Sequence, residues 1–395
     1  MLISEKSATI HRLRPYIVVF MSQSSASPSI NWPAAVMFSI TTLVTLVAVP
    51  WYGISFGYGL SAWLAYVLLT SMTELAITAG YHRLWSHNTY NAHWSLRLYY
   101  ALFGAMALQN SILVWCSGHR THHRFVDDVD KDPYSAKRGL WFSHMGWMLR
   151  NYESGKINLD NAKNLLKDPI VVWQHQYYLW IALAMNFAIP IGLGLIFGNI
   201  WEMVLLAGFL RIVTAHHFTF FINSIVHKWG SQPYTDENTA RDNGFFAILT
   251  HGEGYHNFHH IFQNDYRNGV RWWQWDPTKW FIALAAFLGL AQDLKRISNF
   301  KIMRARVQMQ FKRAQEKLEK NTGKEQWSKH LEDEYAQFKL MVERFTQLQA
   351  DKYQDARRHL QEKWQSAALR THYKELEYAL KMQQKRMKLM LAQLA

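Results

Sequence analysis

Four apolar stretches constrain the fold of this 395-residue chain more than any other feature. Each is about 20 residues long, the length that an α-helix needs to cross the hydrocarbon core of a bilayer. They occupy residues 32–52, 60–80, 177–197 and 200–221. The two short turns that separate the members of each pair contain no Lys or Arg. We therefore predict an all-α integral membrane protein whose four transmembrane helices form two hairpins.

The remaining segments complete the predicted domain organisation. Residues 1–30 form a polar N-terminal leader, in which Met21 is an alternative start, and residues 31–294 form the membrane domain. The leader, the long middle segment and everything after Ile225 are basic, so the positive-inside rule predicts that both termini are cytoplasmic. The stretch from Trp94 to Trp115 contains Arg97, Gln109 and Asn110, and we expect it to pack along the membrane interface rather than cross the bilayer.

The tail, residues 295–395, differs from the rest in charge. It holds 23 Lys and Arg against 12 Asp and Glu, which is +11 of the net charge of +14. Its apolar residues recur at helical spacing, so we predict an amphipathic helical hairpin or coiled coil with a break near Asn321-Thr322-Gly323. The positive excess suits anionic lipid or an acidic protein partner. Nucleic acid is not an expected partner, since no reading motif is present.

Histidine spacing predicts a metal site. Three short stretches hold eight of the 19 histidines: His82 and His87; His119, His122 and His123; and His256, His259 and His260. On a helix the offsets 0, +3 and +4 place the rings on one face, one turn apart. Converging neutral imidazoles bind transition metals. The single cysteine, Cys116, excludes a disulfide and Cys-based zinc or iron–sulfur ligation.

Eight histidines exceed the four ligands of a tetrahedral zinc ion and therefore imply two metal ions. Two redox-active irons can activate O2 and attack an unactivated C–H bond, whereas zinc is redox-inert. We predict a cytoplasmic helical cap that holds a histidine-ligated di-metal centre at the membrane surface. Two classes of protein remain open on the residues alone: an O2-activating enzyme, such as a membrane hydroxylase or alkane mono-oxygenase, and a non-enzymatic metal carrier.

The three histidine stretches resemble the histidine boxes of membrane fatty acyl-CoA desaturases. The residues that carry the resemblance are His82-Arg83-Leu84-Trp85-Ser86-His87, His119-Arg120-Thr121-His122-His123 and Gly252-Glu253-Gly254-Tyr255-His256-Asn257-Phe258-His259-His260. The similarity is closest to the stearoyl-CoA (Δ9) branch. It runs from about Trp32 to Leu294 and includes the stretch Arg138 to Trp147.

This resemblance implies an enzyme of unsaturated fatty acid biosynthesis. It would introduce a cis double bond, at Δ9, into a saturated acyl-CoA at a non-haem di-iron centre, using O2 and two external electrons. No cytochrome b5 module is visible, as in bacterial-type members. We therefore expect electrons from a separate ferredoxin, flavin reductase or cytochrome-type donor, and a location in a bacterial inner membrane.

The resemblance also implies further site residues. The stretch Asn223-Ser224-Ile225-Val226-His227 would supply a ninth ligand, His227, and an asparagine, Asn223, that holds a metal-bound water. Gln109, Trp115 and Thr219 would line the bend of the acyl tunnel, with simple packing as the alternative for Trp115.

Asn110 and Arg138 would meet the CoA portion of the substrate. Ser117-Gly118 stands where the animal members have Arg-Asp, which leaves acyl-lipid or acyl-carrier substrates open. Glu74 is a carboxylate within a predicted span and is therefore expected to be functional, near the closed end of the tunnel, or else to be a hydrogen-bonded structural residue. Thr70, one helical turn away, would limit chain length.

Overall fold

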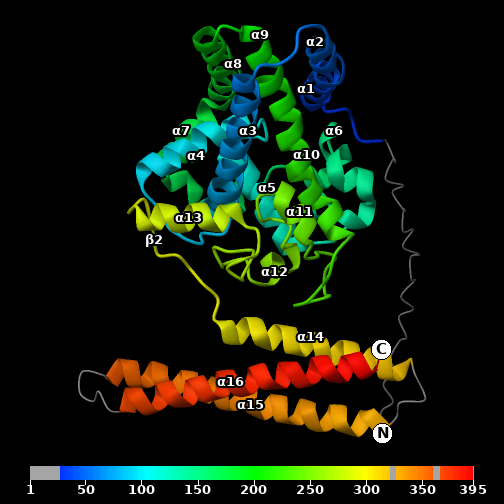
Figure 1. Ribbon diagram of the computed structural model, residues 1–395, viewed down its shortest axis with the longest axis vertical. Helices are drawn as coiled ribbons and strands as arrows, with labels where there is room; N and C mark the ends of the chain where they lie inside the picture. Colours follow the sequence, from blue (N-terminus) through cyan, green and yellow to red (C-terminus); the bar gives the residue numbers. More distant parts are fainter. Residues whose placement is uncertain (1–26, 321–325, 359–364, 395) are drawn as a thin grey trace, which may run out of the picture.

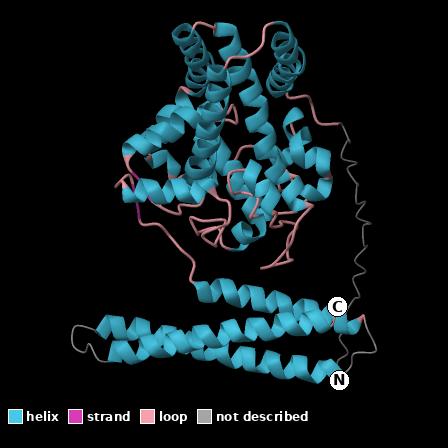
Figure 2. Cartoon of the chain, viewed as in Figure 1, coloured by secondary structure: helices cyan, strands magenta, loops and turns pink. Residues whose placement is uncertain are grey.

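The computed structural model describes residues 27–320, 326–358 and 365–394, and within them the protein is almost entirely helical (Figures 1 and 2). The only named strands in these residues, β1 (Asn91–Ala92) and β2 (Ala291–Gln292), pair antiparallel. Most of the predicted leader and the predicted break at residues 321–323 lie outside the described residues.

Four helices are long and apolar enough to cross a membrane: Trp32–Ser55, Leu60–Ser86, Tyr178–Phe197 and Ile200–His227. The first comprises α1 (Trp32–Leu43), η1 (Val44–Ala48) and α2 (Val49–Ser55), and the second comprises α3 (Leu60–Leu75) and η2 (Ala76–Ser86). The third is α8 (Tyr178–Phe197), and the fourth comprises α9 (Ile200–Met203), η8 (Val204–Leu210), α10 (Arg211–Asn223) and η9 (Ile225–His227). The predicted fold class is confirmed.

Three of these helices extend beyond their predicted ends, the first by only three residues, to Ser55, and the other two by six residues each. The second continues past Gly80 to Ser86, and the fourth continues past Phe221 to His227. The two longer extensions are polar, and every residue of η2 is buried. A helix buried on all sides in protein can carry polar residues that lipid would not accept, so its apolar pattern ends before the helix does.

The outer surfaces of the spans are apolar. Trp32 and Trp51, which lie near the two ends of the first span, are 65% and 60% exposed. Leu46 and Leu195 lie between the helix ends and are each 69% exposed. Such a surface is suited to hydrocarbon rather than water.

A cap of short helices covers one end of the spans. Its main members are α4 (Trp94–Met106), α5 (Ile112–Phe125), α7 (Pro169–Gln176), α11 (Gly244–Leu249), α12 (His256–Ile261) and α13 (Pro277–Phe287). Between α5 and α7 lie η3 (Ala136–Arg138), η4 (Phe142–Gly146), α6 (Trp147–Leu149), η5 (Glu153–Gly155), η6 (Leu159–Ala162) and η7 (Leu165–Lys167). The stretch from Trp94 to Trp115 does not form a span. It divides into α4 and α5 at a turn in which Leu108 and Asn110 have positive φ.

A close contact fixes α4 against η2. A Cβ atom added at Gly104 would lie 2.2 Å from the Tyr81 ring, and one added at Gly80 would lie 2.6 Å from Tyr100. Tyr81 and Tyr100 are both completely buried. Glycine at these two positions therefore allows the helices to approach, and this contact supports the helix that carries His82.

The tail forms three helices, α14 (Asn299–Glu319), α15 (Gln326–Arg358) and α16 (Gln365–Gln393), which pack around a common apolar core. This three-helix bundle replaces the predicted hairpin. The sequence around Arg358, where α15 ends, contains neither Gly nor Pro, so no turn signal predicts the division of this part of the tail into α15 and α16.

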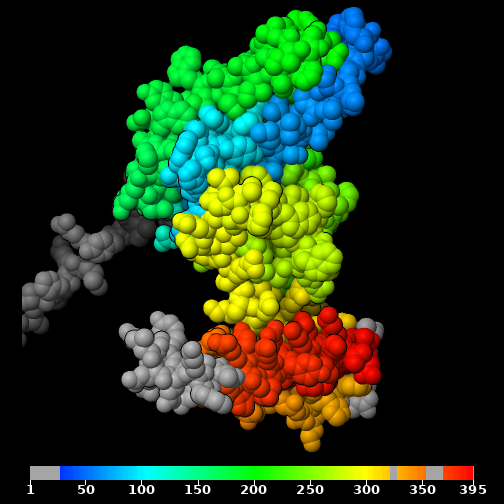
Figure 3. Space-filling model, turned by 60° about the vertical axis from the view of Figure 1, so that its left-hand side comes forward, coloured from blue at the N-terminus to red at the C-terminus, as the bar shows by residue number. Residues whose placement is uncertain are grey.

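The first tail helix joins the bundle to the cap. Ile302 and Ala305 of α14 pack against Tyr234 and Phe258 of the cap. Arg306 donates to the Tyr234 hydroxyl at 2.7 Å, and Lys312 pairs with Asp236 at 2.6 Å. Figure 1 shows α14 running beneath α12 at the end of the molecule opposite α8 and α9, and Figure 3 shows the same stacking from a second direction.

Candidate metal centre

Four helices carry the predicted histidine ligands to one place. His82 lies in η2, and His87 follows the last residue of that helix. The second and third histidine stretches lie on α5 and α12, and His227 ends η9. The histidines with offsets of 0, +3 and +4 therefore do lie on helices, as predicted. The packing of the cap on the spans brings the histidine-bearing faces of these helices together.

The nine histidines form two groups that could each hold a metal ion. Within each group the candidate ligand atoms all lie within 4.8 Å of one another. One group comprises His82, His87, His119, His123 and His259, and the other comprises His122, His227, His256 and His260. The two groups adjoin, since the His123 and His260 rings stack with centroids 4.4 Å apart.

The imidazole nitrogens within each group face one another. The Nε2 atoms of His82 and His259 are 2.9 Å apart, and those of His87 and His119 are 2.8 Å apart. In the other group, the Nε2 of His256 lies 3.1 Å from that of His227 and 3.0 Å from that of His260. Separations of about 3 Å are those of neighbouring donor atoms around one metal ion with bonds of about 2.1 Å. The donor set fits two transition-metal ions.

Burial keeps these imidazoles neutral, as metal ligands must be. Desolvation, assisted by neighbouring imidazoles, lowers the pKa well below the usual value for six histidines outside the spans: His87, His119, His123, His256, His259 and His260. The buried Nε2 of His122 has no hydrogen-bond partner among the described residues. A metal ion would satisfy this lone pair.

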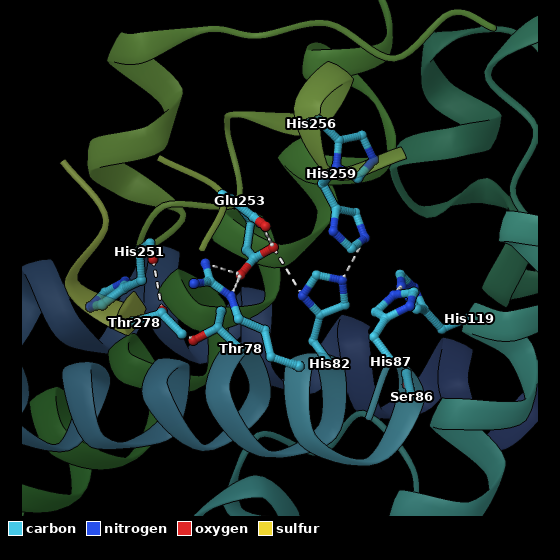
Figure 4. Close-up of polar contacts among 12 residues, drawn as sticks. Thr78, His82, Ser86, His87, His119, His251, Glu253, His256, His259 and Thr278 are labelled. Atoms are coloured by element: carbon cyan, nitrogen blue, oxygen red, sulfur yellow. Dashed lines mark hydrogen bonds and ion pairs between the residues drawn. The ribbon is translucent and has the colours of Figure 1, made fainter. Parts of the chain in front are cut away.

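A buried carboxylate orients His82. Glu253 lies 2.9 Å from the His82 Nδ1, which leaves Nε2 directed into the five-histidine group (Figure 4). Arg83 donates from Nη2 to the other oxygen of Glu253 at 2.9 Å and also pairs with Asp276 at 3.0 Å. Burial acts to raise the pKa of Glu253, but His82 and Arg83 outweigh it and hold that pKa at about 2. The carboxylate therefore stays ionised and pairs with the His82 ring at Nδ1.

Polar side chains also contact the Nδ1 atoms of two histidines in the four-histidine group. Asp132 accepts from the His122 Nδ1 at 2.9 Å. The His227 Nδ1 contacts the Thr239 hydroxyl at 2.8 Å, and that hydroxyl donates to Asp127 at 2.6 Å. The sequence did not predict a supporting role for Glu253, Asp132 or Thr239. Only Glu253 carried a signal, because it lies three residues before His256 within a histidine stretch.

Three residues predicted to line the acyl tunnel lie together beside the five-histidine group. Gln109 donates to the Thr219 hydroxyl at 2.9 Å and accepts from the Trp115 indole at 3.2 Å. The Trp115 ring stacks on His119 with centroids 5.0 Å apart. Trp115 is thus a neighbour of the candidate metal ligands.

The other predicted substrate residues are more dispersed. Asn110 is exposed, and its backbone N–H donates to the Tyr178 hydroxyl at 3.0 Å. The Arg138 guanidinium lies over the Phe142 ring at 3.6 Å and lines an open cavity of about 390 Å³. Asn223 is half-buried at the end of α10.

Two polar residues of α3 lie inside the membrane domain. Glu74 is completely buried, and neither carboxylate oxygen has a hydrogen-bond partner among the described residues. The structural alternative for Glu74, a hydrogen-bonded carboxylate, is therefore not seen in this part of the chain. Thr70 is buried and donates to the Tyr66 carbonyl at 2.7 Å.

Comparison with known proteins agrees with this geometry. A family model described as fatty acid desaturase matches residues 59–286. The chain is 43% identical over 275 residues to "Acyl-CoA desaturase 1" of Saccharomyces cerevisiae, covering 69% of this chain and 53% of that protein. It is 35% identical over 274 residues to "sn-2 palmitoyl-lipid 9-desaturase" of a Nostoc strain, covering 68% of this chain and 91% of that protein.

A third relative is human "Stearoyl-CoA desaturase 5", at 38% identity over 235 residues, which cover 58% of this chain and 70% of that protein. The chain spans about half the length of two yeast relatives: 53% of the Saccharomyces cerevisiae protein and 51% of "Probable acyl-CoA desaturase" of Schizosaccharomyces pombe. The matched region contains all nine clustered histidines. The chain therefore belongs to the fatty acid desaturase family.

Proposed function

We propose that this protein is an O2-dependent acyl-CoA desaturase that forms a cis double bond, at Δ9, at a non-haem di-iron centre. The observation that carries the proposal is the pair of adjoining histidine groups. Nine imidazoles with carboxylate support exceed what one structural or transported ion needs. An enzyme that activates O2 with two metal ions would use both histidine groups, and this favours an enzyme over a metal carrier.

The overall reaction consumes one O2, two electrons and two protons for each saturated CH2–CH2 unit. It yields one alkene and two water molecules, so the substrate loses two hydrogens and the oxygen is fully reduced. Bound iron would supply the O2 activation and hydrogen abstraction that no amino-acid side chain can perform. Its ligands would be the two histidine groups, with Asn223 holding a water molecule.

The protein's own residues would orient the metal-binding imidazoles and select the acyl chain. Glu253, Asp132 and Thr239 hold their imidazoles through Nδ1, which directs Nε2 toward the metal positions. Gln109, Trp115 and Thr219 would hold the acyl chain beside the five-histidine group, with Thr70 and Glu74 at the far end of the tunnel.

The head group of the substrate would lie on the cytoplasmic side, with Asn110 and Arg138 near the CoA portion. Acyl-CoA is the favoured head group because several relatives are named for it, although the Nostoc relative is named for a palmitoyl-lipid. The Δ9 position is favoured by the Nostoc relative, which is named a 9-desaturase, although a cricket relative at 38% identity is named for Δ12. Electrons would come from a separate ferredoxin, flavin reductase or cytochrome-type protein at the cytoplasmic face of a bacterial inner membrane.

The decisive test is the lipid profile of cells that lack their own desaturase and express this chain with a competent electron donor. We expect new cis-Δ9 chains with the wild type and none with His123→Ala. The matched control is His372→Ala, which replaces an exposed tail histidine and should behave as wild type. Hydroxylated chains would indicate a hydroxylase instead, and an unchanged profile with metal-loaded protein would indicate a carrier.

A further inference from the structure

A row of positive side chains follows one face of α16. Its members are Arg370, Lys374, Lys381, Lys385 and Lys388, all of them exposed. At about 100° per residue these positions fall within about 60° of one another around the helix. With a rise of about 1.5 Å per residue they extend over about 27 Å. We call these five residues the basic stripe.

The stripe faces away from the core of the bundle. The α16 residues in that core include Leu376, Leu380 and Met387, which lie on the opposite side of the helix. Glu377 is the acidic residue interleaved with the stripe, and it pairs with Lys381 at 3.1 Å. Figure 3 shows α16 at the surface of the bundle. The stripe therefore presents a net positive face to solvent.

The bundle is held close to the metal centre. Phe258 lies between His256 and His259 on α12, is 1% exposed, and packs against Ile302 and Ala305 of α14. The bundle is therefore anchored, through α14, to the helix that carries three of the nine histidines.

The position of the stripe favours a protein partner over the surrounding membrane. Figure 1 shows the bundle at the end of the molecule opposite α8 and α9, with the cap, including α12, between the spans and the tail. The head groups of the bilayer that contains the spans are therefore not the nearest acidic surface. A soluble acidic protein can reach this end freely.

We propose that the basic stripe is the docking surface for an acidic one-electron carrier protein. This rests on the proposed function, which requires two electrons for each turnover. A carrier that delivers them singly must bind and leave twice, and each visit oxidises it by one electron. Such encounters use small, polar interfaces steered by complementary charge. The stripe has this character, since its five exposed cations outnumber the two exposed apolar side chains beside it, Tyr378 and Leu389.

The test uses the full chain in nanodiscs of neutral lipid with stearoyl-CoA. Electrons come either from an acidic [2Fe–2S] ferredoxin with its reductase and NADPH, or from reduced methyl viologen, which needs no docking site. Because reduced viologen itself reacts with O2, it is used for a single turnover: it reduces the protein in the absence of O2, and O2 is then admitted. The stripe variant is Lys374→Glu with Lys381→Glu and Lys385→Glu. The control variant has the same change in charge, Lys329→Glu with Lys339→Glu and Lys352→Glu, at exposed positions scattered around α15.

We expect the stripe variant to lose kcat/KM for ferredoxin by about tenfold to a hundredfold at low ionic strength. Its turnover with viologen should match the wild type, and the control variant should keep both activities. Added salt should slow the ferredoxin reaction of the wild type far more than that of the stripe variant, because salt screens the exposed charges.

Several outcomes would overturn the proposal. One is an equal loss of kcat/KM for ferredoxin in the stripe variant and the control variant, and another is no loss in the stripe variant. A third is a wild-type protein that turns over with viologen but with neither ferredoxin nor a soluble cytochrome b5 domain. Stripe-dependent binding to phosphatidylglycerol vesicles with unchanged ferredoxin kinetics would identify a lipid surface instead. Absence of turnover with viologen in metal-loaded wild type would contradict the proposed desaturase itself.

Discussion

The His82 imidazole and the Glu253 carboxylate meet at 2.9 Å inside the protein, where both side chains are almost completely buried. Glu253 also binds Arg83, which comes from the same helix as His82. One carboxylate thus connects the third histidine stretch to the first. This arrangement makes the orientation of a candidate ligand depend on a residue that does not touch the metal position.

Glu253→Gln should therefore weaken the five-histidine group. The amide is neutral, so it holds the imidazole less firmly and leaves the buried Arg83 charge only partly compensated. We expect metal affinity and turnover to fall by about tenfold to a hundredfold, the usual effect of losing such a partner. Metal content by mass spectrometry, with Glu316→Gln on the exposed face of α14 as control, checks this. Full metal content and wild-type turnover would show that Glu253 has no such role.

Asp132→Asn should weaken metal binding by the four-histidine group. Asp132 accepts from the His122 Nδ1 at 2.9 Å and also from the backbone N–H of Asp127 at 3.0 Å. We expect the metal content to fall from about two ions toward one per chain, with affinity reduced by about tenfold to a hundredfold. The matched control is Asp128→Asn, a partly exposed turn carboxylate four residues earlier that accepts from backbone N–H groups, pairs with Lys131 and contacts no histidine among the described residues. Equal metal loss in both variants would contradict the assignment.

Acid should destabilise the metal-free protein. Burial lowers the pKa of six histidines in the cap well below the usual value of about 6.5, which they regain on unfolding. Below about pH 6.5 the unfolded chain therefore binds more protons than the folded one, and the free energy of unfolding falls as pH falls. Each extra proton contributes a slope of about 1.4 kcal/mol per pH unit.

One buried carboxyl opposes this trend. Burial raises the pKa of Asp242 to about 7, so the folded chain holds its proton where the unfolded chain releases it. That single group adds stability as pH falls from about 7 to 4, but six imidazoles outweigh it. Chemical denaturation in detergent between pH 8 and pH 5 measures the net slope. A free energy of unfolding that is constant or increases on acidification would contradict this account.

Phe258→Ala should separate the tail from the cap. Phe258 is 1% exposed and lies in the apolar cluster with Tyr234, Ile302 and Ala305. Removing a buried phenylalanine side chain costs about 3–5 kcal/mol. We expect a clearly lower melting temperature and greater protease cleavage between residues 294 and 299. The control is Phe287→Ala, whose side chain is 86% exposed and should change neither measurement.

The parts of this molecule that the sequence predicts are those set by local spacing. Offsets of 0, +3 and +4 define a helix face, so the ligand faces of α5 and α12 follow from the chain alone. Long apolar runs identify the spans because about 20 consecutive apolar residues are enough for a helix to cross the bilayer. Asp132 and Thr239 lie in irregular segments, where no periodicity indicates which imidazole they support.

The position of α14 could not be predicted for a different reason. Phe300 and Val307 face the bundle, whereas Ile302 and Ala305 face the cap. An amphipathic pattern reveals that a helix has apolar faces but not which surface each face covers. Tertiary packing determines that choice, and with it the contact between the tail and the helix of His256.

Two glycines should respond to alanine in opposite ways. Gly118 immediately precedes His119 on α5, yet an added Cβ would meet nothing within 4 Å. Gly118→Ala should therefore keep full metal content and stabilise the protein by about 0.5–1 kcal/mol, the usual gain inside a helix. Gly104 lies outside the histidine stretches, but its added Cβ would lie 2.2 Å from the Tyr81 ring.

Gly104→Ala must therefore push α4 away from the helix that carries His82, at a cost of about 1–3 kcal/mol for overpacking. Melting temperature and metal content of the two variants, measured side by side, test this reversal. Damage from Gly118→Ala with tolerance of Gly104→Ala would mean that the glycine in the histidine stretch is needed for close approach of a ligand. The expected result would mean that the metal centre depends more on the packing of α4 than on its own nearest glycine.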